Sequence, residues 1–524
     1  MRLAIVEFVF TILIYWTTLS IGDIHLTMKN YVDKSIQFQC KDDISLNFSN
    51  TVISYINQDF ISNPIITCLN LIGSNIEDIE KGAFNKLPNL THLFLSNNNL
   101  DGNKLFNFGT HNKLQVLIMN KVIKPETYSR CTCIQPFCEM YDMHESNITV
   151  TVQVVDEYPN LEILSLHANC LENLQSFPLM EETTSYYSLK PLHYRNFELK
   201  NNKITSKVTQ VVFPKLKILD LSENRINRTN FINLLSNSLY FLDLHDNLVN
   251  SLSLNKKGNN LFALNLDNNN FKYISYQNNK KNPSLSMAGL KNLHYLSVFN
   301  NRINVIASDA FQDNDKLFYL NLSSNNINYI YPDTFANLQY LKTLDLSINK
   351  LNNVIRISKE IEINTLYINY NNITKLFSYS FVQMPKLTKL LLGQNKIDEI
   401  DVNAFDLLFN LEELDLSANM LRFLPQNWTD SLVSIKYLDL SDNQFMSLKD
   451  LSLSNTSPLI EIYFIRNSLK YLNVAYFIEN LPQNLTINLT NRSNFTKWIW
   501  PTWGNNYYKN ILNQENYDEY LDES

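Results

Sequence analysis

The chain has 524 residues, of which 45% are hydrophobic and nine are glycine, a composition that excludes a fibrous or low-complexity protein. Its formal net charge of -7 disfavours general binding to nucleic acid. The apolar residues recur too regularly for a disordered chain, so we expect a folded protein.

The N-terminus predicts export from the cell. Arg2 opens a short basic segment, an apolar run spans residues 8–19, and Ser20 and Gly22 occupy the -3 and -1 positions of a cleavage site before Asp23. This pattern predicts a signal peptide, with a buried helix as the alternative. No second apolar stretch of about 18 residues follows. We therefore expect a secreted, extracellular chain without a membrane span.

One frame, L-x-x-L-x-L-x-x-N-x-L, recurs through most of the chain. The alternation of its leucines predicts a short strand with the leucines on one side. A single coil cannot bury these leucines, but stacked coils form a continuous core. We count sixteen copies, which begin at Ile66, Leu90, Leu114, Leu161, Tyr194, Leu216, Leu239, Leu261, Leu293, Leu317, Leu341, Ile363, Leu387, Leu411, Ile435 and Leu459.

With this repeat, the chain resembles extracellular leucine-rich repeat proteins, including the ectodomains of Toll-like receptors, but without their transmembrane and TIR regions. The resemblance implies an α/β solenoid, a horseshoe with a parallel β-sheet on its concave face and an irregular or helical convex side. It also implies that each consensus asparagine, such as Asn349, bonds to backbone groups of neighbouring coils. Late in five copies stand phenylalanines that we expect to stack along the convex side: Phe84, Phe311, Phe335, Phe381 and Phe405.

The frame divides the chain into segments. After the signal peptide at 1–22, we expect an N-terminal cap at 23–65, the repeats at 66–482, a C-terminal cap at 483–504 and an acidic tail at 505–524. The stretch "LTINLTNRSNF" is expected to contain a degenerate closing strand.

Three spacings between copies exceed the usual 22 to 24 residues, so we expect loops or extra turns there. The first insertion, at 123–160, carries "SRCTCIQPFC", the second "MEETTSYYSLKPLH" and the third "YQNNKKNPSLSMAG". Insertions in single repeats often form binding loops, although neutral variation of a loop is the alternative.

The six cysteines are even in number and, in an oxidising compartment, favour disulfides. Cys40 and Cys68 are expected to pair across the N-terminal cap. For the other four, a bond between Cys131 and Cys133 would be strained. Two arrangements stay open, namely Cys131–Cys138 with Cys133–Cys170, or Cys131–Cys170 with Cys133–Cys138.

A zinc site made of the three insertion cysteines and His144 is the alternative to these disulfides. The spacing C-x-C-x4-C-x5-H is unusual for zinc, and secretion disfavours free thiolates. We therefore expect no metal site and no cofactor.

Twelve N-x-S/T sequons predict a glycoprotein. Asn321 matters most, because the frame places it on the concave face beside Phe318, where a glycan would block a ligand. The twelve are Asn47, Asn89, Asn147, Asn227, Asn321, Asn372, Asn427, Asn455, Asn484, Asn488, Asn491 and Asn494.

The residues flanking the strand leucines are expected to point to the concave surface and to form two stretches. The first is acidic and comprises Glu198, Asp220, Glu223, Asp243, Asp246 and Asp267, with His245 among them. A structural role of the repeated aspartates is the alternative. The second is aromatic, and exposed aromatic residues are typical anchors of interfaces. Our candidate ligand-binding residues are therefore Phe262, Tyr295, Phe299, Phe318, Tyr319, Tyr367 and Tyr370.

The sequence carries no catalytic motif of the common hydrolase, metalloprotease or nucleotide-binding types, so we predict no enzyme and no catalytic residue. The resemblance instead implies a recognition protein that binds a protein, a glycan or a microbial surface ligand through its concave face and insertion loops, with a role in innate immunity. The alternatives are a structural glycoprotein of the extracellular matrix or of cell adhesion, and an inhibitor of another protein. The oligomeric state stays open.

Overall fold

The computed structural model describes residues 44–106, 108–124, 150–154, 158–176, 212–254, 258–277, 284–470, 481–482 and 484–489. The predicted signal peptide, the acidic tail and most of the first two insertions lie outside these residues. The chain divides into two units, one of which, Ser45–Ile487, contains the repeats. The other unit falls almost wholly outside the described residues.

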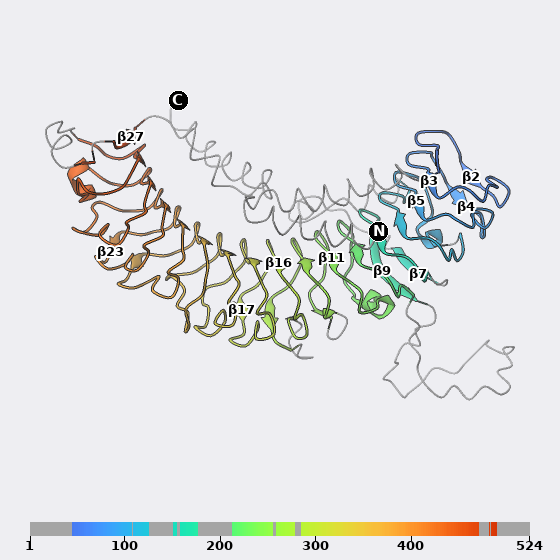
Figure 1. Ribbon diagram of the computed structural model, residues 1–524, viewed down its shortest axis with the longest axis horizontal. Coiled ribbons are helices and arrows are strands. Elements are labelled where there is room, and N and C mark those ends of the chain that lie inside the picture. Colours follow the sequence, from blue (N-terminus) through green and yellow to red (C-terminus); the bar gives the residue numbers. More distant parts are fainter. Residues whose placement is uncertain are drawn as a thin grey trace, which may run out of the picture. The chain divides into compact units, whose positions relative to one another are not determined.

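The repeat unit is a parallel β-solenoid of stacked coils (Figure 1). Each sheet strand has three residues with the frame leucine, or an equivalent, in its centre, and strands of successive coils pair in register, as Leu320 does with Leu344. Among the described residues, seventeen strands join this sheet: β1 (Ser45–Asn47), β3 (Cys68–Asn70), β5 (His92–Phe94), β6 (Val116–Ile118), β8 (Ile163–Ser165), β10 (Ile218–Asp220), β11 (Phe241–Asp243), β13 (Ala263–Asn265), β16 (Tyr295–Ser297), β18 (Tyr319–Asn321), β19 (Thr343–Asp345), β20 (Thr365–Tyr367), β22 (Lys389–Leu391), β24 (Glu413–Asp415), β25 (Tyr437–Asp439), β26 (Glu461–Tyr463) and β27 (Thr486–Asn488).

The ends of the sheet differ in part from the sequence prediction. Strand β1 lies inside the segment predicted as a cap and pairs with β3, so the sheet starts one coil earlier than the frame indicated. The reason is that Leu46 and Phe48 keep the apolar alternation while the asparagine position is occupied by Thr51. At the other end, the expected closing strand is confirmed as β27.

The predicted coil at Tyr194 is wrong. Tyr194 itself lies outside the described residues, but β8 pairs directly with β10, and Ile163 faces Ile218 in that pairing. The sheet therefore has no position for a further strand between them. The frame letters at this point reflect the high leucine and asparagine content of the chain and not a coil of the sheet.

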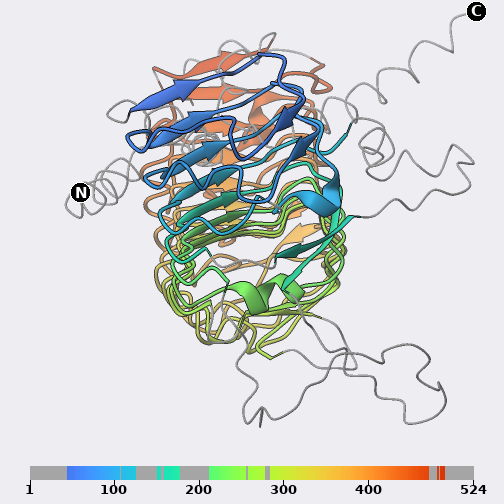
Figure 2. The ribbon, with the colours of Figure 1, turned by 90° about the vertical axis from the view of Figure 1, so that its right-hand side faces the viewer.

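The opposite side of the coils carries turns, short strands and 3-10 helices (Figure 2). The expected parallel solenoid with an irregular or helical convex side is confirmed: in the described ranges this side is irregular with 3-10 turns, and no α-helix occurs there. The elements of this side are β2 (Tyr55–Ile56), β4 (Asp78–Ile79), η1 (Gly102–Lys104), β7 (Val150–Val154), β9 (Leu171–Ser176), η3 (Asn230–Leu234), β12 (Leu252–Ser253), β14 (Tyr273–Ser275), β15 (Leu285–Ser286), β17 (Val305–Ile306), β21 (Lys375–Leu376), β23 (Glu399–Ile400) and η5 (Leu448–Leu451).

Two insertions return to the solenoid as extra strands on this side. The first ends in β7, which pairs in parallel with β9. The third supplies β15, which pairs with β12 and with β14 and so lies between them. The expectation that the third insertion forms an extra turn while the frame resumes is therefore confirmed.

The asparagine positions hold neighbouring coils together. The Asn349 side-chain oxygen accepts a hydrogen bond from the backbone N–H of Ile327 at 3.0 Å, and its amide donates to the carbonyls of Leu322 and Leu346 at 3.0 and 3.1 Å. Asn325, Asn395, Asn419 and other consensus asparagines repeat this arrangement. Because these backbone groups are buried, the ladder satisfies polar groups that would otherwise lack partners.

The late phenylalanines also lie where the frame predicted. Phe84, Phe311, Phe335, Phe381 and Phe405 are all buried. Phe381 stacks on Phe405 with ring centroids 6.0 Å apart, and Phe311 lies at the same distance from Phe335. The predicted aromatic spine is therefore confirmed within these coils.

A left-handed residue precedes each consensus asparagine. At this position φ is 50° for Glu223, 54° for Asp246, 49° for Asn300 and 52° for Ile348. The left-handed residue lies in the turn that follows each strand, where the chain direction changes. It recurs coil after coil, so residues at this position lie one above another beside the sheet.

Candidate binding surface

We call the side chains of the sheet strands that point away from the core, together with the residues just before and after each strand, the strand face. On this surface Tyr295 of β16 stacks on Tyr319 of β18, with ring centroids 4.6 Å apart and planes only 4° from parallel. Both side chains are buried, and Tyr367 and Phe299 are buried as well. The expected exposure is therefore wrong for these four residues, and for Tyr295 and Tyr319 the reason is that rings on strands one coil apart cover each other.

The other three aromatic candidates, Phe262, Phe318 and Tyr370, are half-buried. Phe262 is stacked between Tyr240 and His294, with centroid distances of 4.9 and 4.5 Å. From the sequence, Tyr240 and His294 were not predicted as part of this surface. The pattern was visible in the sequence, because in three successive coils an aromatic ring stands directly before the strand. These three rings form a column along the entry edge of β11, β13 and β16.

Burial raises the pKa of the Tyr295 and Tyr319 phenols well above the usual value. Burial also raises the pKa of Tyr367, and the nearby Asp345 adds to this. The three hydroxyls therefore stay neutral at physiological pH.

The repeated aspartates have a structural contact in common. The carboxylates of Asp220, Asp243, Asp345, Asp415 and Asp439 each accept a hydrogen bond from the backbone N–H two residues later, over 2.8 to 3.0 Å. These contacts support the structural reading of the repeated aspartates. Burial raises the pKa of Asp345 to about 6, and hydrogen bonds from Ser347 and Ser323 limit the rise.

Acidic residues and histidines gather beside β8, β10 and β11. His245 Nδ1 lies 2.7 Å from Asp243 Oδ1, and His245 Nε2 lies 3.7 Å from Asp246 Oδ2. His167 Nε2 lies 3.7 Å from Glu223 Oε1. We call these five residues the histidine–carboxylate cluster. Glu198, a predicted member of the acidic stretch, lies outside the described residues.

The charges in this cluster are strongly coupled. Burial lowers the pKa of His245, but the carboxylates of Asp243, Asp246 and Asp220 outweigh this and raise it to about 10. Burial raises the pKa of Asp267, in the next coil, to about 7, although Ser297 and the backbone of Phe299 donate hydrogen bonds to it.

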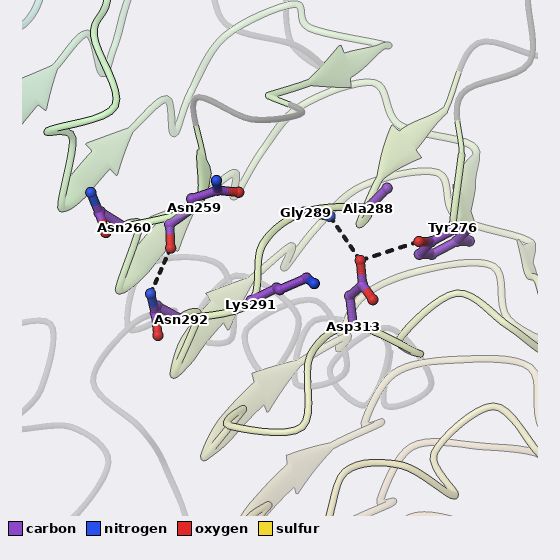
Figure 3. Close-up of a pocket in the computed structure, with 8 residues that line it drawn as sticks. All are labelled: Asn259, Asn260, Tyr276, Ala288, Gly289, Lys291, Asn292 and Asp313. Carbon is purple, nitrogen blue, oxygen red and sulfur yellow. Dashed lines mark hydrogen bonds between the residues drawn. The ribbon is translucent and has the colours of Figure 1, made fainter.

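A pocket of about 530 Å³ lies beside the third insertion (Figure 3). Asp313 accepts hydrogen bonds from the Gly289 backbone N–H at 3.1 Å and from the Tyr276 hydroxyl at 3.2 Å. Lys291 extends into the space between Asn292 and Asp313 (Figure 3). The lining consists of Asn259, Asn260, Tyr276, Ala288, Gly289, Lys291, Asn292 and Asp313.

Two of the six cysteines lie in the described residues, and both Cys68 and Cys170 are disulfide-bonded. The predicted partners Cys40, Cys131, Cys133 and Cys138 lie outside the part of the chain that the structure describes. His144 of the alternative zinc site lies outside it as well. The pairing pattern therefore stays a prediction.

The sequons differ in accessibility. Asn321 is buried, and its side-chain oxygen accepts hydrogen bonds from the backbone and hydroxyl of Ser323 at 3.0 and 2.6 Å. By contrast, Asn47, Asn227, Asn427, Asn455 and Asn484 are exposed, while Asn89, Asn372 and Asn488 are half-buried. Asn147, Asn491 and Asn494 lie outside the described residues.

Two repeat families match the sequence. The family described as "Leucine rich repeat" matches residues 291–351, 361–421 and 385–445, and "BspA type Leucine rich repeat region (6 copies)" matches residues 16–135. No curated protein matches the chain. Over the described residues, no helix has the length and apolar character that crossing a membrane requires.

Several solved structures resemble the chain. An internalin of Listeria monocytogenes is 19% identical over 66% of this chain and 87% of its own, with a TM-score of 0.43. A leucine-rich repeat protein of Leptospira interrogans is 19% identical over 80% and 94%, with a TM-score of 0.46. TLR13, solved with a single-stranded RNA, is 18% identical over 86% and 67%, with a TM-score of 0.41. With TM-scores below 0.5 these likenesses carry no weight, and the fold follows from the strand register and the repeat matches.

Proposed function

Because the chain belongs to the leucine-rich repeat proteins, we propose that it is a secreted recognition protein that binds a protein or a microbial surface ligand through its strand face, in innate immunity. Solenoids of this kind are typically non-enzymatic scaffolds for protein–protein interaction. The observation that carries the proposal is the single in-register sheet, on which the leucines are constant and the outward residues change from coil to coil.

The side chains that point away from the core divide the strand face into regions of different chemistry. The histidine–carboxylate cluster lies beside β8 to β11, and the ring column of Tyr240, Phe262 and His294 follows it. Further along, Lys389 of β22 forms an ion pair with Glu413 of β24 at 2.6 Å. A partner that spans several coils would meet charged and aromatic groups in a fixed order, which favours selective binding.

The proposal includes how the chain is processed. We propose that residues 1–22 are removed as a signal peptide, that Cys40 pairs with Cys68, and that Cys170 bonds to the insertion cysteines. The exposed sequons at Asn227, Asn427 and Asn455 would then carry glycans. All of these steps require the oxidising secretory route.

Affinity capture tests this proposal. The full chain is immobilised and exposed to the native extracellular fluid, and captured proteins are identified by mass spectrometry. A Phe262→Ala/Phe318→Ala double variant serves as the disrupted strand face. The matched control is Tyr329→Ala/Tyr340→Ala, which removes two aromatic rings that are 58% and 59% exposed outside the strand face.

We expect a partner that the wild-type chain and the control retain and the strand-face variant loses. Capture of no partner at several salt concentrations contradicts the recognition role. Retention of the chain in salt-extractable matrix without a selective partner supports the structural alternative instead.

A further inference from the structure

We propose that His167, Glu223, His245 and Asp246 form a site for one divalent transition-metal ion, with Zn²⁺ as the ion that fits the ligand set. This inference does not depend on the proposed recognition function.

The repeat brings the four residues together from three coils. Their strands β8, β10 and β11 are direct neighbours in the sheet. Glu223 and Asp246 occupy the same left-handed position in adjacent coils, with φ of 50° and 54°. His167 and His245 occupy the position just before it, in the two coils on either side of the Ser222 position. Glu223 therefore lies in the coil between the two histidines, and Asp246 lies in the same coil as His245.

The ring orientation of His245 is fixed as in a metal ligand. Its Nδ1 lies 2.7 Å from the Asp243 carboxylate, which accepts the Nδ1–H hydrogen bond. This contact directs Nε2 toward Asp246, whose Oδ2 lies 3.7 Å away. Histidines that bind metals commonly donate their other ring N–H to a carboxylate, which fixes the tautomer and increases ligand basicity.

His167 is oriented in the same sense by a different group. Its Nδ1 lies 2.9 Å from the Ser222 hydroxyl oxygen. Because the Ser222 hydroxyl donates its own hydrogen to Asp220 at 2.6 Å, its oxygen is left to accept from His167 Nδ1–H. His167 Nε2 therefore faces Glu223, with Oε1 at 3.7 Å.

The spacing is close to that of a metal site. One ligand atom each from Glu223, His245 and Asp246 lie within 4.8 Å of one another. Ligand atoms on a tetrahedral Zn²⁺ lie about 3.4 Å apart, because each bond is about 2.1 Å long. Rotamer adjustments of about 1 Å would bring these three ligand atoms around one ion, and His167, whose Nε2 lies 3.7 Å from Glu223 Oε1, would approach the ion from the side of Glu223. All three side chains, like His167, are partly solvent-exposed, which leaves a path for the ion.

The surrounding charge favours a dication. Asp220 and Asp267 lie close enough to act on His245 in addition to the carboxylates of the cluster. Five carboxyl groups thus lie near His245. Two imidazoles with two carboxylate oxygens suit zinc and its neighbours, whereas calcium and magnesium prefer oxygen ligands alone.

The test is zinc binding by the tag-free full chain after removal of metal with a chelator. ZnCl₂ is titrated by isothermal calorimetry, and bound zinc is measured by elemental analysis after dialysis. We expect one equivalent of zinc in the wild-type chain and at least a tenfold weaker affinity in His245→Gln and in Asp246→Asn. The Asp243→Asn variant, which removes an orienting group, is expected to weaken binding by about 10- to 100-fold.

His294→Gln is the matched control, because His294 is a half-buried histidine of the strand face that lies in the ring column and outside the cluster. Its affinity for zinc should equal that of the wild-type chain. Glu223→Gln provides a second ligand variant at a more exposed position, so that a folded protein is available even if His245→Gln fails to fold. Absence of zinc binding, or equal zinc affinity in the ligand variants, overturns the proposal. It would mean that the histidines of the cluster only form ion pairs with its carboxylates.

Discussion

The side-chain oxygen of Asn349 accepts a hydrogen bond from the backbone N–H of Ile327, one coil earlier, at 3.0 Å. This contact joins two coils that have no covalent link near this point. Because the same arrangement recurs along the solenoid, the asparagine ladder is as much a part of the fold as the leucine core.

Replacing this asparagine should loosen the two coils. Asn349→Ala leaves the buried N–H of Ile327 without its partner and removes one of the two amide donors to the carbonyls of Leu322 and Leu346, so we expect a loss of about 1–3 kcal/mol in the free energy of unfolding. Urea unfolding measures the loss, and hydrogen exchange at Ile327 locates it. The exposed Asn352→Ala is the control and should change neither. Equal stability of both variants would contradict a structural role of the ladder.

Replacing Ile348, which has a left-handed backbone conformation, with a residue that tolerates this conformation should stabilise the fold. A β-branched side chain at φ of 52° is strained, because its Cβ crowds the carbonyl oxygen. Ile348→Asn should therefore raise the free energy of unfolding by about 1 kcal/mol. Ile348→Val keeps the branched carbon and is the control, which should not stabilise the chain. A destabilised Ile348→Asn variant would show that packing of this side chain outweighs its strain.

Asp345 predicts a dependence of stability on pH. Its folded-state pKa is raised to about 6, above the ordinary value of 3.8. The native state therefore binds more protons than the unfolded state between about pH 4 and pH 6, and the free energy of unfolding falls as pH rises through this window. The shift corresponds to about 3 kcal/mol at most.

Asp345→Asn should abolish this fall in the free energy of unfolding with pH. The amide oxygen can still accept the hydrogen bond from the Ser347 N–H, but it carries no charge. Urea unfolding from pH 4 to pH 7 should show a flatter profile and greater stability above pH 6 than in the wild-type chain. Asp333→Asn, at an exposed position, is the control. A variant that is less stable at pH 7 would mean that the ionised carboxylate is favoured in the fold.

Glycan mapping should separate buried from exposed sequons. After expression through a eukaryotic secretory pathway, peptide mapping with and without glycosidase should find glycans at Asn227, Asn427 and Asn455. Asn321 should be unmodified, because its side chain is buried and hydrogen-bonded to Ser323. Full occupancy at Asn321 would contradict the packing of β18.

The repeat made much of the fold predictable. The frame leucines, Asn349 and the phenylalanine spine were correctly placed, since each follows from one period and the need to bury apolar groups. The coil at Tyr194 was predicted wrongly because only one copy of the pattern supported it. One copy of a degenerate pattern carries little information, and only the direct pairing of β8 with β10 excludes it.

The candidate site was less predictable. Tyr295 and Tyr319 were expected to be exposed, but whether a ring on a strand is covered depends on the residue one coil away. Likewise, His167 and Glu223 meet although they are far apart in sequence. Sequence reading found the acidic stretch but not its histidine partner in the preceding coil, because an unpredictable insertion separates them.

The central claim is that the strand face is the binding surface, and hydroxyl-radical footprinting of the chain bound to its captured partner tests it most directly. Side-chain oxidation is compared between the free and the bound chain by mass spectrometry. We predict that oxidation of Phe262 and Tyr370 falls on binding, while that of the exposed Tyr329 and Tyr340 stays the same. Protection of Tyr329 and Tyr340 without a change at Phe262 and Tyr370 would contradict the account.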